Sequence, residues 1–188
     1  RVLFADLNLT LQGQERVALI GPNGCGKSTL LKVLLGELPP MAGTFRWGAR
    51  IKLGYMAQNQ DTLDPSLSAL ETLQAIRPMT MSESYHFLHY FLFDEDQVIL
   101  PSASLSFGQR SRLMLACLVA EGANVLVLDE PVNYLDIPSR EQFEQALQAF
   151  TGGVLLVAHD RAFISRVTEK TWLLEDSKIK IGWSEDLV

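Results

Sequence analysis

A glycine-rich segment carries the clearest chemistry in the sequence: Gly21-Pro22-Asn23-Gly24-Cys25-Gly26-Lys27-Ser28. It matches the phosphate-binding P-loop pattern G-x-x-x-x-G-K-[ST]. Its glycines let the backbone curl until successive N–H groups surround an anion, and the following helix adds the positive end of its dipole. We expect Lys27 to meet the β- and γ-phosphates of ATP and Ser28 to ligate Mg²⁺, with Thr29 completing the nucleotide-binding residues. A turn that binds nothing is disfavoured, because the segment follows an apolar strand and opens a helix.

Two adjacent carboxylates end the apolar run Val125-Leu126-Val127-Leu128-Asp129-Glu130. The run is typical of a buried parallel strand, and ligands of open α/β sheets bind where such strands end. We expect Asp129 to hold Mg²⁺, directly or through water, and Glu130 to polarise the attacking water. Alone, the pair could equally be an acidic helix cap before Pro131. The P-loop upstream favours the catalytic interpretation.

A third segment, Leu105-Ser106-Phe107-Gly108-Gln109, precedes an amphipathic helix expected at 110–120. Ser106 and the Gly108 amide could present a phosphate with donors at the helix N-terminus. The alternative is a simple helix cap by Ser106. The pentapeptide does not decide between them by itself.

The elements that must position these groups alternate between strand and helix. Strands are predicted at 7–11, 16–20, 44–47, 51–56, 125–128, 154–158, 171–174 and 178–181, and helices at 28–35, 139–150 and 161–168. The alternation predicts an α/β fold with a mostly parallel sheet, and together with the P-loop it resembles the RecA-like core of P-loop NTPases. From about 67 to 120 the spacing is helical instead. We interpret residues 64–112 as an inserted helical lobe within a single domain, 1–188.

Composition limits the classes of protein to consider. The 188 residues, 47% of them hydrophobic, suit one globular domain. The longest apolar runs are strand-sized, well short of the roughly 20 residues that span a bilayer, so we expect no membrane insertion. Two cysteines indicate reduced thiols and a cytoplasmic location. The net charge of -6 opposes nucleic-acid binding by bulk electrostatics.

Taken in order, these motifs resemble those of the ABC ATPase family over nearly the whole chain. The resemblance implies that Gln58 contacts Mg²⁺ and the attacking water, and that His159 lies near the γ-phosphate. It implies that segment 105–109, the signature, acts through Ser106, Phe107, Gly108 and Gln109 on the ATP of a partner domain. Residues 133–136 are similar to the D-loop. Alone, Gln58 could be a polar loop residue and His159 a satisfied strand-end histidine.

Within the family, the residues of these motifs are similar to those of the ABC-F subfamily. Residues 129–136, DEPVNYLD, are similar to its D-E-P-T-N-H-L-D, with Val132 and Tyr134 as departures, and residues 159–164 are similar to its H-D-R-x-F-[LI]. Transporter domains usually carry Ser where Asn133 stands. Phe107 departs from the usual first glycine of the signature. The adenine-stacking aromatic should precede Arg1, so we expect an N-terminally truncated domain, the second of a tandem pair.

The resemblance implies ATP hydrolysis to ADP and phosphate in a head-to-tail sandwich with a second ABC ATPase domain. ABC-F proteins mostly act on ribosomes, so we expect a ribosome-associated translation or antibiotic-resistance factor. Two alternatives remain open. One is the motor subunit of an ABC membrane transporter. The other is a nucleotide-gated clamp or DNA-repair ABC domain, which predicts long heptad stretches that the chain lacks.

Overall fold

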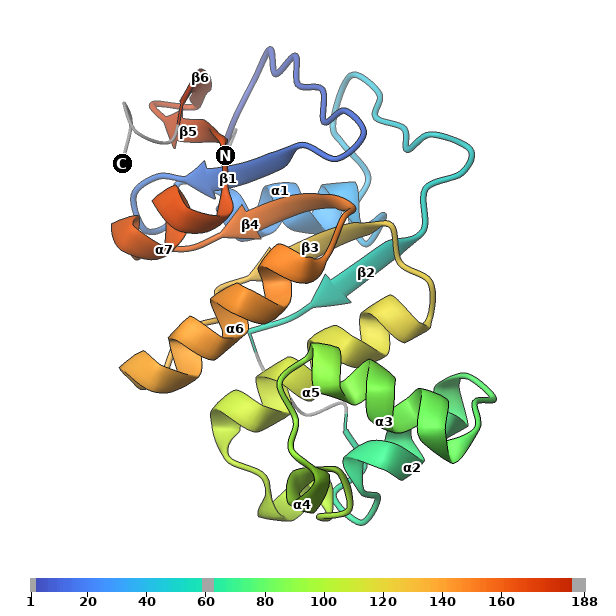
Figure 1. The fold of residues 1–188 in the computed structure, drawn as a ribbon. Helices are drawn as coiled ribbons and strands as arrows, with labels where there is room; N and C mark the ends of the chain where they lie inside the picture. Colours follow the sequence, from blue (N-terminus) through green and yellow to red (C-terminus); the bar gives the residue numbers. More distant parts are fainter. Residues whose placement is uncertain (1–2, 59–62, 184–188) are drawn as a thin grey trace.

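One six-stranded sheet organises the protein, seen in a computed structural model that describes residues 3–58 and 63–183 (Figure 1). The strand order is β2-β3-β4-β1-β5-β6. The first five strands pair in parallel and β6 runs antiparallel beside β5. The strands are β1 (Arg16–Ile20), β2 (Leu53–Met56), β3 (Val125–Asp129), β4 (Gly153–Val157), β5 (Lys170–Glu175) and β6 (Lys178–Trp183). The predicted α/β class with a mostly parallel sheet is confirmed.

Helices cover both faces of the sheet. They are α1 (Lys27–Leu34), α2 (Ala69–Ile76), α3 (Met81–Tyr90), α4 (Glu95–Val98), α5 (Phe107–Ala120), α6 (Ile137–Ala149) and α7 (Arg161–Val167), with a 3₁₀ turn, η1 (Ser102–Ser104). Successive strand residues face opposite ways. Leu126 and Leu128 therefore join the core beneath α5, α6 and α7, while Val127 joins the core beneath α1. Burial on both faces explains the unbroken apolar run of β3.

Two predicted strands are wrong. Leu7, Leu9 and Leu11 are half-buried while Asn8 and Thr10 are exposed, so the alternation was correctly identified, but residues 7–11 form no ladder. Residues 44–47 are likewise outside any strand. Alternation reports which side chains are covered, whereas a strand also needs a partner for its backbone groups. The sequence pattern indicates the burial of the side chains but not the pairing of the backbone.

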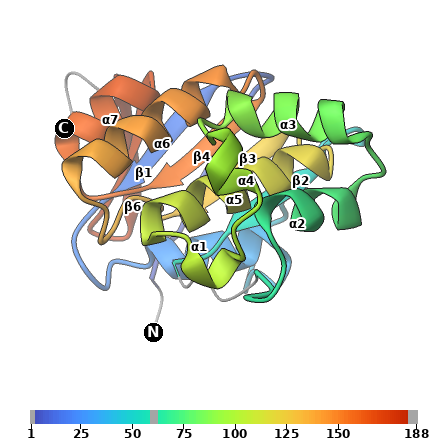
Figure 2. The ribbon, with the colours of Figure 1, turned by 60° about the horizontal axis from the view of Figure 1, so that its bottom comes forward.

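Helices α2 and α3 pack against α5, which contacts β2 at the edge of the sheet, and α4 packs against α2 and α3 (Figures 1 and 2). Capping boxes start several of these helices, as at Ser68 with Glu71 and at Thr80 with Glu83. In such a box each side chain satisfies a backbone N–H that the helix leaves free. The helices fall within 64–112, the range that we propose for the inserted lobe. No helix in the described ranges is long and apolar enough to cross a membrane.

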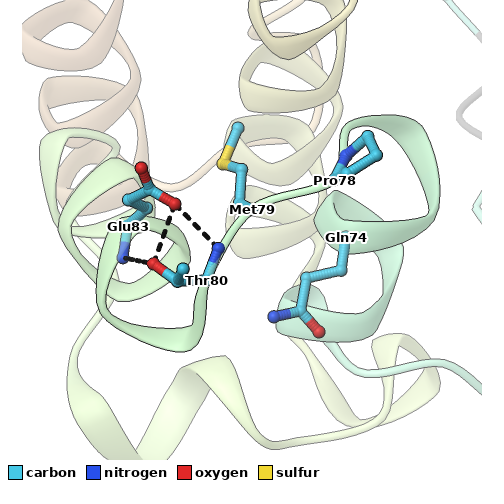
Figure 3. A pocket seen from close by; sticks show the side chains of 5 residues that line it. All are labelled: Gln74, Pro78, Met79, Thr80 and Glu83. Atoms are coloured by element: carbon cyan, nitrogen blue, oxygen red, sulfur yellow. Dashed lines mark hydrogen bonds between the residues drawn. The ribbon is translucent and has the colours of Figure 1, made fainter.

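A surface pocket of about 480 Å³ lies between α2 and α3, and Figure 3 shows the side chains that line it: Gln74, Pro78, Met79, Thr80 and Glu83. Its carboxylate is already engaged, because Glu83 Oε2 accepts from the backbone N–H and the hydroxyl of Thr80, each at 2.8 Å. These bonds hold the pKa of Glu83 below its usual value. The carboxylate in this pocket therefore serves as part of the cap of α3.

Candidate active site

The predicted catalytic segments gather at one edge of the sheet. Gly21 directly follows β1, Asp129 ends β3, His159 comes two residues after β4 and Gln58 two residues after β2. These four strands are neighbours and run in parallel, so their carboxyl ends share an edge, toward which the arrowheads of β1, β2 and β4 point in Figure 1. This is the edge at which open α/β sheets bind their ligands.

The glycines of the P-loop are required by its backbone. Gly21, Gly24 and Gly26 have φ values of +152°, +76° and +117°, where side chains other than hydrogen are strained. At Gly21 an added Cβ would lie 2.2 Å from the carbonyl oxygen of Leu174 in β5. The loop therefore passes so close to the sheet that only glycine fits at its first position.

Lys27 lies inside this loop with only 8% of its surface exposed. Its Nζ donates to the carbonyl oxygens of Gly21 at 2.8 Å and Pro22 at 3.1 Å. Helix α1 begins at Lys27 without a side-chain cap, because its N-cap residue is Gly26. An ammonium and the uncapped N–H groups of a helix N-terminus thus meet at one place, an arrangement suited to a polyphosphate.

Asp129 supplies a carboxylate beside the loop. Burial raises its pKa above the usual value, the neighbouring charge of Glu130 raises it further, and Lys27 opposes both. A cation bound here would relieve the repulsion between the two carboxylates. No cluster of three or more His, Cys, Asp or Glu that could hold a metal occurs among residues 3–58 and 63–183. The donors present, Asp129 and the exposed hydroxyl of Ser28, suit Mg²⁺, which completes its coordination with water and substrate phosphates.

Glu130 is held from several sides. Its backbone N–H donates to the carbonyl of Val157 in β4 at 2.8 Å, and its φ of +52° is unusual for a residue with a side chain. Its Oε1 lies 3.3 Å from His159 Nε2, and its Oε2 accepts from the Nδ2 of Asn133. The Glu130 side chain is 19% exposed and that of His159 47% exposed. A carboxylate fixed this way and still reached by solvent is suited to orient a water molecule.

The remaining predicted residues belong to two other segments. Gln58 is exposed beyond β2. Ser106 caps α5, since its Oγ accepts from the N–H of Gln109 at 3.2 Å while Gln109 Oε1 accepts from the N–H of Ser106 at 2.7 Å. The cap that the sequence offered as an alternative therefore exists, and Ser106 stays exposed. Two of the three departures from the family pattern lie together, because the rings of Phe107 and Tyr134 pack edge to face with their centroids 6.2 Å apart.

Two contacts were missed by the sequence interpretation. The first is the bond between Asn133 and Glu130, which their spacing of three residues across Pro131 could have suggested as a turn. The second involves Asp160, which caps α7 by accepting from the N–H of Phe163 at 2.8 Å and pairs with Arg140 of α6. Asp160, the residue after His159, therefore stabilises the start of α7 and its contact with α6.

Comparison with known proteins agrees with this geometry. Residues 4–133 match the family described as ABC transporter. The chain is 42% identical over 179 residues to "Putative ATP-binding protein YdiF" of Bacillus subtilis, covering 95% of this chain and 28% of that protein. It is 37% identical over 185 residues to "ATP-binding protein Uup" of Escherichia coli, covering 96% of this chain and 29% of that protein. The chain thus spans less than a third of the length of these relatives.

Solved structures share the fold. A putative metal-chelate type ABC transporter in an inward-facing conformation matches with a TM-score of 0.80 and 26% identity, over 98% of this chain and 78% of that one. A dimeric ATP-binding cassette in a post-hydrolysis state, bound to ADP and Pi, matches with a TM-score of 0.74 and 23% identity, over 97% of this chain and 90% of that one. The shared architecture extends over almost the whole chain.

Proposed function

The chain belongs to the ABC transporter family as an ATP-binding ATPase domain, and we propose that it hydrolyses ATP as one half of an ABC-F type pair that acts on the ribosome. The observation that carries the hydrolytic part is the position of Glu130. Its carboxylate is clamped at the sheet edge next to Asp129 and reached by solvent. The assignment to the ABC-F subfamily is supported by the sequences of residues 129–136 and 159–164.

ATP binding is assigned to the P-loop, residues 21–28, together with Thr29. On phosphate binding, Lys27 Nζ exchanges its bonds to the loop carbonyls for the β- and γ-phosphate oxygens, which are stronger, charged acceptors. The N-terminus of α1 supports the same phosphates. Because Lys27 is almost buried, its charge acts where water screens it little.

Ser28 and Asp129 would hold Mg²⁺, with Gln58 as the further ligand that the family resemblance implies. A bound Mg²⁺ neutralises charge on the phosphates. Burial, and then the charge of Glu130, raise the pKa of Asp129, and its carboxyl group must lose its proton before it can bind Mg²⁺. The chain contributes few ligands, as Mg²⁺ sites that share phosphate oxygens usually do.

Hydrolysis is assigned to Glu130 and His159. The Glu130 carboxylate orients a water molecule and accepts its proton as the water oxygen attacks the γ-phosphorus, while the bond from that phosphorus to the oxygen shared with the β-phosphate breaks and ADP leaves. His159 Nε2 lies within reach of the same carboxylate and steadies it at the phosphate end of the sheet. Position and charge neutralisation supply most of the rate gain in such reactions.

A second ABC domain completes the site in this proposal. The helix after the P-loop and the helix after the signature cover opposite faces of the sheet, and Ser106 is exposed, so we assign segment 105–109 to another domain's nucleotide. Ser106, Phe107, Gly108 and Gln109 would face that nucleotide in a head-to-tail pair. The dimeric form of the similar cassette supports pairing of this kind.

The ribosomal role is tested with a trapped protein. In the full native protein, Glu130→Gln preserves side-chain shape but removes the base, so ATP should bind and hold the paired domains closed. We expect this variant to co-sediment with ribosomes in ATP and not in ADP. Lys27→Ala, which should bind ATP poorly, is the control and should stay in the supernatant with either nucleotide.

The second candidate is the motor subunit of a membrane transporter, favoured by the 0.80 TM-score to a metal-chelate type ABC transporter. It predicts that the Glu130→Gln protein fractionates with membranes and ignores ribosomes in ATP. The same fractionation experiment therefore decides between the two roles. Neither outcome alters the assignment of ATP hydrolysis.

A further inference from the structure

We propose that Asn133 is a positioning residue for hydrolysis, whose side-chain amide fixes the carboxylate of Glu130 in the plane that aims it at water. The inference rests on the proposed role of Glu130 and adds a third residue to the pair formed with His159. It is carried by one contact, the bond from Asn133 Nδ2 to Glu130 Oε2.

The turn after β3 delivers this amide. The N–H of Asn133 donates to the carbonyl oxygen of Glu130 at 3.2 Å, which closes a turn across Pro131 and Val132. The next residues form a second turn, in which the N–H of Leu135 donates to the carbonyl of Val132 at 3.2 Å. Both bonds use backbone atoms only. The turn therefore does not need the Asn133 side chain, which is left to contact Glu130.

Two side chains contact different oxygens of one carboxylate. His159 Nε2 lies 3.3 Å from Oε1, and Asn133 donates to Oε2. A single contact leaves a carboxylate free to rotate about its last bond, whereas contacts to both of its oxygens fix its plane. Each oxygen accepts more than one hydrogen bond, so a water molecule still finds a free lone pair. An amide suits this task because it donates without adding charge beside Asp129.

The backbone of Glu130 is fixed, but its carboxylate needs further contacts to hold one orientation. Its positive φ of 52° and its bond to Val157 of β4 set where the side chain leaves the sheet. The side chain then has several rotatable bonds before the carboxylate. Loss of the Asn133 donor should broaden the carboxylate's orientations without moving the backbone, which lowers the rate of the chemical step more than the affinity for ATP.

The test compares variants of the full native protein by steady-state ATP hydrolysis and by titration with ATP. Asn133→Leu keeps the side-chain size and removes the donor, and Asn133→Ser keeps a shorter donor. We expect kcat to fall about tenfold for Asn133→Leu and less for Asn133→Ser, with the ATP Kd changed less than about twofold. On a Glu130→Gln background, adding Asn133→Leu should lower the residual rate by less than about twofold, because the group that it positions is already gone.

Asn124→Leu provides a matched control at the opposite end of the same strand. Asn124 links β3 to the segment before β2 through bonds of 2.8 Å to the Lys52 N–H and the Arg50 carbonyl, so its loss should lower the melting temperature while kcat stays unchanged. If Asn133→Leu behaves as Asn124→Leu is expected to, with a lower melting temperature and an unchanged kcat, the side chain is structural and the inference is wrong. An unchanged kcat in Asn133→Leu, or an undiminished effect on the Glu130→Gln background, also overturns it. A wild-type protein without ATP hydrolysis would overturn the proposed function first.

Discussion

Gly108 lies in the signature, yet its packing predicts that it is needed even without a partner domain. It is the second residue of α5 and faces the first turn of α6. A Cβ added there would lie 2.5 Å from Ser139 Cβ and 2.6 Å from Ser139 Oγ. The hydroxyl can rotate away, but the Cβ is fixed by the backbone of α6. Gly108→Ala must therefore push the two helices apart.

Two opposing terms set the size of the effect. Overpacking of this kind costs about 1–3 kcal/mol, while replacing glycine by alanine within a helix recovers about 0.5–1 kcal/mol. The difference predicts that Gly108→Ala lowers the free energy of unfolding by about 1 kcal/mol. For a domain of this size that corresponds to a melting temperature about 2–4 °C lower.

Urea and thermal unfolding of four proteins measure this term: the wild type, Gly108→Ala, Ser139→Gly and the double variant. Ser139→Gly removes the obstructing Cβ, so the alanine should cost nothing, or even stabilise, on that background. A coupling energy of about 1 kcal/mol or more between the two sites is expected. If Gly108→Ala is as stable as the wild type and the two changes are additive, the close contact of α5 with α6 is not what requires glycine.

Three further predictions follow from single contacts. Burial raises the pKa of Cys117 to about 12, so iodoacetamide at neutral pH should label the half-buried Cys25 and leave Cys117 unmodified in the folded protein. ATP should slow the labelling of Cys25, because this thiol lies in the P-loop. Mass spectrometry of the labelled peptides measures both effects. Arg16→Met should lower the free energy of unfolding in urea by about 1–3 kcal/mol, because its guanidinium closes the C-terminus of α6 through the carbonyls of Leu147, Gln148 and Phe150. ATP turnover per molecule of the isolated chain should fall on dilution, since the signature serves a partner's nucleotide; turnover that is independent of concentration contradicts the shared site.

The strongest sequence patterns predicted the fold because each reflects a local physical need. The apolar run at 125–128 indicates a strand that is buried on both faces, as it is. The P-loop glycines indicate backbone conformations that are strained for other residues, as their φ values are. Alternation at 7–11 indicated burial correctly but could not reveal whether another strand lies alongside. Pairing depends on residues distant in sequence, so it escapes a local pattern.

Several contacts in the candidate site could not be predicted from the sequence for the same reason. The sequence placed Glu130 and His159 at strand ends, but their 3.3 Å approach depends on β3 and β4 being neighbours. The contact between Phe107 and Tyr134 joins two departures that looked independent in the sequence. The need for glycine at position 108 arises from α6, which follows it by a whole strand and a turn.

The most direct test of the central claim is the identity of the nucleotide that stays bound after incubation with Mg-ATP and rapid removal of free ligand. The wild-type protein should retain ADP, Glu130→Gln should retain ATP, and Lys27→Ala should retain little of either. The hydrolysis rate of Glu130→Gln should be lower on the order of a thousandfold. ADP on Glu130→Gln formed at the wild-type rate, or an unchanged ATP affinity in Lys27→Ala, would contradict the account.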